Sequence, residues 1–152
     1  MPRFLALDVG DSTVGVAVSD ALGVTAQGIT TIRRGAWKND VAQLKAIMEQ
    51  YETESLIVGL PRNMNGTEGA RCEVVRTFAA DLTAALPTAQ ITFWDERLST
   101  VTAENVLKDA GMNWRKRRKV VDKMAATVIL QSFLDAHAAG HLTNDNGNAE
   151  GR

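Results

Sequence analysis

Three strand-like segments follow one another at the start of the chain, and the turns between them are too short to hold a helix. Residues 3–9, 14–19 and 24–33 are rich in apolar and β-branched residues, and short turns near Gly10 and Gly23 separate them. Such short turns join antiparallel strands, because parallel neighbours need a crossover of a dozen or more residues. The sequence therefore predicts an antiparallel meander at the beginning of the fold.

The rest of the chain alternates between helical and strand-like patterns. The compact apolar run 56–60 is typical of a strand that is covered on both faces, and a second strand is expected over 90–95. Helices are expected over about 41–51, 70–86, 100–110 and 120–138. We therefore predict an α/β fold in which helices cover one mixed sheet of five strands.

The length of 152 residues suits a single domain, which we place at residues 1–139. Residues 140–152 are polar and rich in Asn and Gly, so we expect a disordered tail.

The composition excludes several classes of function. Two histidines and the single Cys72 are too few for a typical structural zinc site or an internal disulfide, so we expect a reducing, cytoplasmic setting. No apolar run approaches the ~20 residues needed to span a bilayer, so no membrane association is expected. Aromatic residues make up 5% of the chain, which disfavours a single-strand binder built on stacking platforms.

Three acidic residues lie next to predicted strands or helices, where a buried carboxylate is costly unless a cation, a hydrogen-bond donor or a catalytic role compensates for it. Asp8 closes the apolar run 4–7, Glu96 follows the predicted strand 90–95, and Asp122 precedes the helical stretch 124–134. Each has an ordinary explanation when taken alone, because Asp8 could cap a turn, Glu96 could pair with a surface cation and Asp122 could favour a helix N-terminus. Their joint presence favours a shared site.

The densest patch of positive charge lies just before Asp122. It consists of Arg115, Lys116, Arg117, Arg118 and Lys119, in a chain whose net charge is −1. Any attraction of nucleic acid must therefore be local, although a solvated loop is the ordinary interpretation of such a run. Three dispersed carboxylates beside a basic run indicate metal-assisted phosphodiester chemistry.

Four blocks of sequence carry a resemblance to a known family. They are LALDVG at 5–10 with GVAVSD at 15–20, IVGLP at 57–61 with NMNGT at 63–67, DERLST at 95–100, and VDKMAA at 121–126. In this order, and over about residues 4–135, they closely resemble the YqgF/RuvX family. No single block would be specific by itself.

The resemblance implies a ribonuclease H-like fold with strand order 3-2-1-4-5. It also implies that Asp8, Glu96 and Asp122 bind a divalent metal, and Mg²⁺ or Mn²⁺ suits such an oxygen-only set. Structured nucleic acid is the implied substrate, either the 5′ end of the 16S ribosomal RNA precursor or a four-way Holliday junction. Junction resolvases act as symmetric dimers, so a homodimer is a further expectation.

Several neighbouring residues receive secondary roles. Asp95 should face away from Glu96 unless the strand has already ended, so Glu96 is taken as the ligand and Asp95 as a possible supporting group. Arg71 and Arg97 are candidates for phosphate contacts. Many family members have basic residues where this chain has Ser12-Thr13, so hydroxyls replace a phosphate contact expected there.

Two other classes of function remain open from the sequence. The segment 8–13 is similar to the first phosphate loop of actin-like ATPases and sugar kinases, but those enzymes close two such domains around a nucleotide. An inactive module that only docks on RNA is the other alternative, and loss of one acidic ligand would be its signature. All three acids are present.

Overall fold

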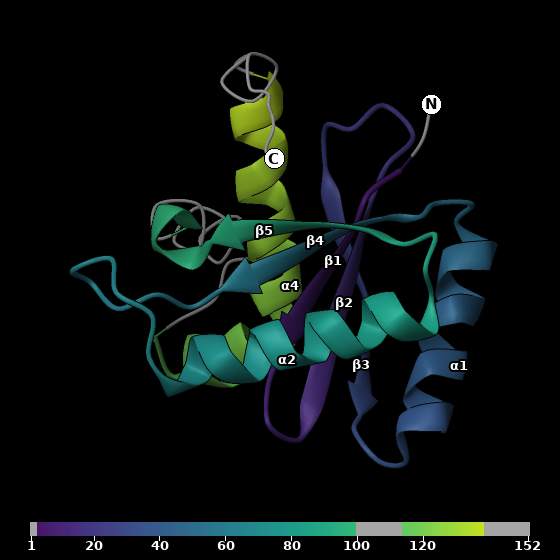
Figure 1. Cartoon of the computed structure of the whole chain (residues 1–152). Coiled ribbons are helices and arrows are strands. Elements are labelled where there is room, and N and C mark those ends of the chain that lie inside the picture. The colour runs from purple at the N-terminus through teal and green to yellow at the C-terminus, as the bar shows by residue number, and fades with distance from the viewer. Residues whose placement is uncertain (1–2, 100–113, 139–152) are drawn as a thin grey trace.

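The computed structural model describes residues 3–99 and 114–138, with the side chains of the last helix described from residue 124 onward. Its centre is a five-stranded sheet of order β3-β2-β1-β4-β5 (Figure 1). β1 (Leu5–Val9), β2 (Thr13–Ser19) and β3 (Ala26–Arg33) form the antiparallel meander that the short turns predict. The predicted strand order is confirmed.

The other two strands run parallel to β1. β4 (Ser55–Leu60) pairs with β1, and β5 (Gln90–Asp95) pairs with β4. Leu7 lies opposite Val58, and Gly59 lies opposite Trp94. The carboxyl ends of β1, β4 and β5 therefore meet at one edge of the sheet, which is where parallel α/β sheets place ligands.

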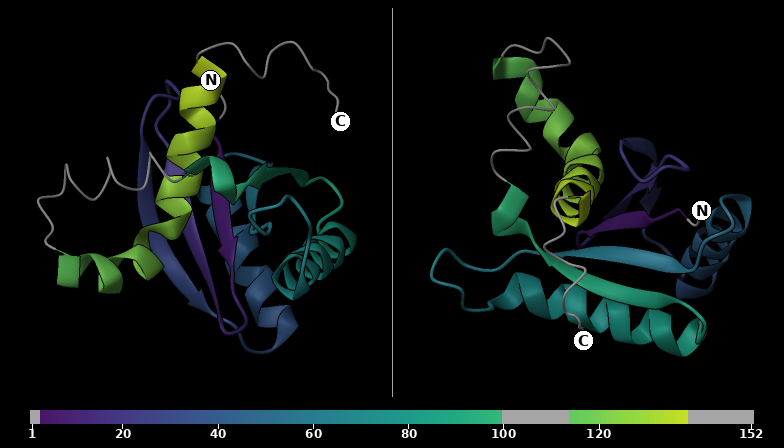
Figure 2. Two further views of the ribbon diagram at one scale, coloured as in Figure 1. Left: turned by 90° about the vertical axis from the view of Figure 1, so that its left-hand side faces the viewer. Right: turned by 90° about the horizontal axis from the view of Figure 1, so that it is seen from above.

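Helices cover both faces of the sheet (Figures 1 and 2). Two separate apolar layers lie between the helices and the sheet. α1 (Trp37–Gln50) and α2 (Ala70–Ala85) pack on one face, where Leu44 and Phe78 join the larger core. α4 (Trp114–Ala138) crosses the other face, where Ile129 and Phe133 pack with Ala6, Ile57 and Trp94. Because strand residues alternate between faces, Ala6 and Leu7 enter different cores.

The last helix begins earlier than its apolar pattern predicts. It starts at Trp114 rather than near residue 120, so the basic run 115–119 belongs to a helix and not to a loop. Lys and Arg are good helix formers, and an already nucleated helix extends readily through them. The helix expected over 100–110 and the tail 140–152 lie outside the described residues.

α1 also begins earlier than predicted, at Trp37 rather than near residue 41, whereas the strands and α2 lie within about two residues of their predicted bounds. α2 ends at Ala85, two residues before Pro87, because proline restricts the residue that precedes it. None of the helices in the described part of the chain is long and apolar enough to cross a membrane.

Candidate active site

Asp8 lies on the face of the sheet that α4 covers. It is two residues beyond Ala6, which packs in the α4 layer, so the strand alternation turns both to the same side. Its partner on β2 is Gly15, where an added Cβ would lie 3.6 Å from Ala126 Cβ and 3.7 Å from Asp8 Cβ. Small residues on β2 and α4 therefore let the helix lie directly against the strand beside Asp8.

Glu96 reaches the same face from β5. The strand ends at Asp95, and Glu96 opens a short 3-10 helix over Glu96–Ser99. A Cβ at Gly59 would lie 2.8 Å from Glu96 Oε2 and 2.5 Å from Ile129 Cδ1. Gly59 lies on β4, the strand between β1 and β5, and leaves room between the two acids, because any larger residue there would clash with the Glu96 carboxyl.

Asp8 and Glu96 lie near enough for their charges to interact. Burial, together with repulsion from the nearby Asp8 carboxylate, raises the pKa of Glu96 to about 7, and Arg71 opposes both effects. Two half-buried carboxylates that repel each other form a site of negative potential, which a divalent cation would neutralise. Their oxygens are the donors that Mg²⁺ and Mn²⁺ prefer, so the residues fit such an ion.

The structure brings Asp8 and Glu96 together and places the backbone of Asp122 in α4. Residue 122 precedes Ala126 by one helical turn, and Ala126 is the residue that approaches Gly15 beside Asp8. The Asp122 side chain lies outside the described residues. Among the side chains that are described, no three His, Cys, Asp or Glu residues form a group able to hold a metal.

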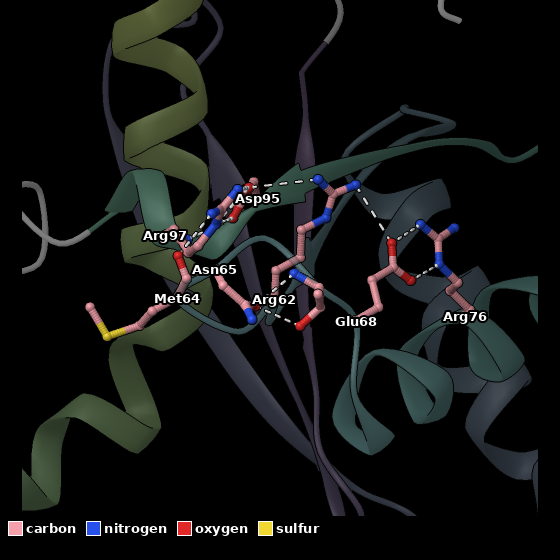
Figure 3. Close-up of polar contacts among 8 residues, drawn as sticks. Arg62, Met64, Asn65, Glu68, Arg76, Asp95 and Arg97 are labelled. Carbon is pink, nitrogen blue, oxygen red and sulfur yellow. Dashed lines mark hydrogen bonds and ion pairs between the residues drawn. The ribbon is translucent and has the colours of Figure 1, made fainter.

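Asp95 is held by arginines, unlike its neighbour Glu96. Arg97 donates from its backbone N–H to Asp95 Oδ1 at 2.9 Å and from Nη2 to Oδ2 at 2.6 Å, and Arg62 lies 4.0 Å away (Figure 3). The hydrogen bond from the Arg97 side chain lowers the pKa of Asp95. Asp95 therefore organises the end of β5, and its partner Arg97 is a structural clamp as well as a candidate phosphate ligand.

Of the other cations predicted to bind phosphate, the structure describes the side chain of Arg71 but not those of the basic run. Arg71 Nη1 lies 3.7 Å from Asp11 Oδ2, and more than half of each side chain is exposed. Arg71 is also close enough to Glu96 to lower its pKa, so it lies at the edge of the site. The side chains of residues 115–119 lie outside the described residues, although their backbone forms the first turns of α4.

Comparison with known proteins assigns the chain to a family. The sequence model of RuvX, described as "Holliday junction resolvase", matches residues 2–136. The chain belongs to the RuvX family. Two similar relatives are named "Putative pre-16S rRNA nuclease". One, from Clostridium novyi (strain NT), is 53% identical over 88% of this chain and 98% of its own length. The other, from Moorella thermoacetica, is 53% identical over 88% of this chain and 94% of its own.

The solved structures that resemble this RuvX family member agree on the fold. Thermus thermophilus RuvC in complex with a Holliday junction substrate aligns with a TM-score of 0.55 and 11% identity, covering 92% of this chain and 97% of that one. A separate structure of RuvC from the same organism aligns with a TM-score of 0.52 and 12% identity, covering 91% of this chain and 96% of that one. The expected ribonuclease H-like fold is confirmed. The family match and the names of the relatives identify the chain as a nuclease, an enzyme that hydrolyses phosphodiester bonds.

Sequence reasoning missed Arg34, which supports the turn after Asp8. Its Nη1 donates to the Gly10 carbonyl at 2.8 Å, and its backbone N–H donates to the Ser12 carbonyl at 2.8 Å. The guanidinium also lies 5.2 Å from the Phe78 ring centre. No local signal marks this residue, because Gly10 lies 24 positions earlier, in the turn between β1 and β2.

Proposed function

We propose that this RuvX family member is a divalent-metal-dependent endonuclease that acts on structured nucleic acid, with the 5′ end of the 16S ribosomal RNA precursor as its substrate. The observation that carries the proposal is the convergence of Asp8 and Glu96 on one face of the sheet, with Gly59 leaving space between them. The names of the relatives from Clostridium and Moorella support the choice of substrate.

In this proposal Asp8, Glu96 and Asp122 hold Mg²⁺ or Mn²⁺. The position of residue 122, one turn before Ala126, supports its inclusion, because Ala126 lies beside Gly15 and Asp8. The bound metal would supply the positive charge that makes a water nucleophilic and stabilises the leaving oxygen. Glu96 contributes a carboxyl group that titrates near neutral pH in the metal-free protein, so metal and proton compete for it.

The same helix would supply both metal binding and substrate binding. The basic run 115–119 occupies the first turns of α4, ahead of Asp122. Such a cluster would hold the phosphates on either side of the cleaved bond, and Arg71 would add a contact at the edge of the site. We expect binding to weaken steeply with salt, since each neutralised phosphate releases a counterion.

Cleavage of two substrates in parallel tests the proposal. A 16S precursor RNA that includes its 5′ leader and a synthetic four-way DNA junction would be incubated with the enzyme and Mg²⁺, Mn²⁺ or EDTA. We expect metal-dependent cleavage of the RNA. Preferential cutting of the junction by a homodimer would instead support the resolvase alternative, because paired cuts require a two-fold arrangement.

A matched pair of variants separates the site from general effects of charge. Asp8→Asn should abolish cleavage while the protein keeps its fold and melting temperature. Asp81→Asn removes the same charge from an exposed position on α2 and should cleave as the wild type does. Equal activity of wild type and Asp8→Asn would contradict the assignment, and metal-independent cleavage would contradict the metal site.

A further inference from the structure

Met64 has an unusual exposure for a large apolar side chain. It is 96% exposed and lies in the loop 61–69 between β4 and α2. The other exposed large apolar side chains of the described residues are Leu22, Leu98 and Val24, and all three are less exposed than Met64. Methionine is flexible and adaptable, and it suits contact with an apolar partner of irregular shape.

The tip that carries Met64 is a rigid turn. The backbone N–H of Gly66 donates to the Asn63 carbonyl at 2.9 Å, and that of Asn63 donates to the Thr67 carbonyl at 2.8 Å. Asn65 Oδ1 accepts from the Thr67 N–H at 3.1 Å, and Gly66 has a φ of 88°, which favours glycine. The turn therefore fixes the position of the Met64 backbone before any ligand binds.

Charged side chains anchor this tip to the active site. Arg97, which directly follows Glu96, donates from Nη1 to the Met64 carbonyl at 3.3 Å. At the base of the loop, Glu68 accepts from Arg76 Nε at 2.6 Å and lies 3.5 Å from Arg62. Figure 3 shows the Met64 side chain turned away from these contacts. The Arg97 side chain thus links the Met64 carbonyl to the residue directly after Glu96.

The charges around the tip favour a polyanionic partner. The side chains of Arg62, Arg76 and Arg97 are 36%, 45% and 38% exposed, whereas those of Asp95 and Glu68 are 18% and 31% exposed. Each arginine side chain is therefore more exposed than the acid with which it pairs. An exposed apolar side chain beside three partly exposed arginines suits nucleic acid, where arginines contact phosphates and apolar side chains contact bases.

We propose that Met64 inserts between two stacked bases next to the phosphate that is cut. Apolar wedges of this kind unstack a base step and bend the backbone, and methionine is one of the residues that act so. The rigid turn and the Arg97 contact hold the wedge at a fixed offset from Glu96. This inference rests on the proposed nuclease function, and it makes Met64 a determinant of the preference for paired, structured substrates.

Base fluorescence and cleavage test the wedge together. The probe is a copy of the cleaved substrate, RNA leader or four-way junction, with 2-aminopurine placed beside the mapped cut and Ca²⁺ replacing Mg²⁺ to keep it uncut. Wild-type protein should raise the 2-aminopurine fluorescence, Met64→Leu should preserve the rise, and Met64→Ser should lose it. Leu22→Ser, which removes another exposed apolar side chain from the β2–β3 turn, is the matched control.

The cleavage rates give a second readout. Met64→Ser should lower kcat/KM on the paired substrate by about tenfold or more, the scale expected when a methionine side chain is no longer buried against the bases. The loss should shrink on a substrate already unpaired at the cut, and the melting temperature should stay unchanged. Equal fluorescence and equal rates in wild type and Met64→Ser would overturn the wedge while leaving the nuclease intact.

Two further outcomes would also overturn the proposed insertion of Met64. Loss of a dimer by Met64→Ser without loss of the fluorescence change would assign the side chain to a protein contact and overturn the inference. If wild-type protein cuts neither substrate, the proposed function fails and the wedge fails with it.

Discussion

Replacing Glu96 by Gln should change how the stability of the metal-free protein depends on pH. The pKa of Glu96 is about 7 in the fold, against an ordinary value of 4.5. The two values differ by about 2.5, and each pKa unit corresponds to about 1.36 kcal/mol. The upper limit is thus about 3 kcal/mol, and because Glu96 is half-buried and partly screened by solvent we expect about 1–3 kcal/mol.

The sign follows from proton binding. Between about pH 4.5 and pH 7 the folded protein keeps a proton on Glu96 that the unfolded chain has released. The stabilisation that this bound proton gives the folded protein is therefore fully present below about pH 4.5. It is lost as the pH rises through about 7. The glutamine side chain of the variant cannot titrate, so the variant should gain stability relative to wild type across this window.

Urea unfolding in EDTA at several pH values between 5 and 8 measures the effect. We expect the difference in unfolding free energy between Glu96→Gln and wild type to grow with pH. Glu73→Gln, at an exposed position on α2, is the matched control and should show a smaller change. In an Asp8→Asn background the growth should shrink, because the Asp8 charge is one cause of the raised pKa. A difference that stays flat across this pH range would refute the reasoning.

Two further substitutions test the packing and the clamp of the site. Gly59→Ala would place a Cβ 2.5 Å from Ile129 Cδ1 and 2.8 Å from Glu96 Oε2, so we expect a loss of about 1–3 kcal/mol in urea unfolding together with weaker cleavage. Gly35→Ala, where nothing lies within 4 Å of the new Cβ, should leave both unchanged, and equal behaviour of the two variants would contradict the packing. Arg97→Lys keeps the charge but loses the paired hydrogen bonds to Asp95, so we expect cleavage to fall because Arg97 acts as a clamp. Retained cleavage would instead show that Arg97 acts by simple charge attraction.

The sequence predicted the sheet and the positions of Asp8 and Glu96 because these follow from local patterns. The short turns dictate the meander, and an acid after an apolar run marks a strand end. The alternation of β5 did not by itself decide between Asp95 and Glu96, because the strand ends at Asp95.

The contacts that support the site could not be predicted in the same way. Glu68 pairs with Arg76 across eight positions, and Arg34 reaches Gly10 across 24. Such pairs depend on how the loops fold back on the sheet, and no periodicity encodes them. The early start of α4 at Trp114 was missed because five like charges indicate a solvated loop, although each of them also favours a helix.

A crystal structure of the protein grown with Mn²⁺, with anomalous scattering recorded to locate the metal, tests the central claim most directly. We expect Mn²⁺ between the carboxylates of Asp8 and Glu96, with an oxygen of Asp122 at coordination distance, about 2.0–2.3 Å. Manganese bound elsewhere, or an Asp8–Glu96 pair that stays empty at saturating Mn²⁺, would contradict the account.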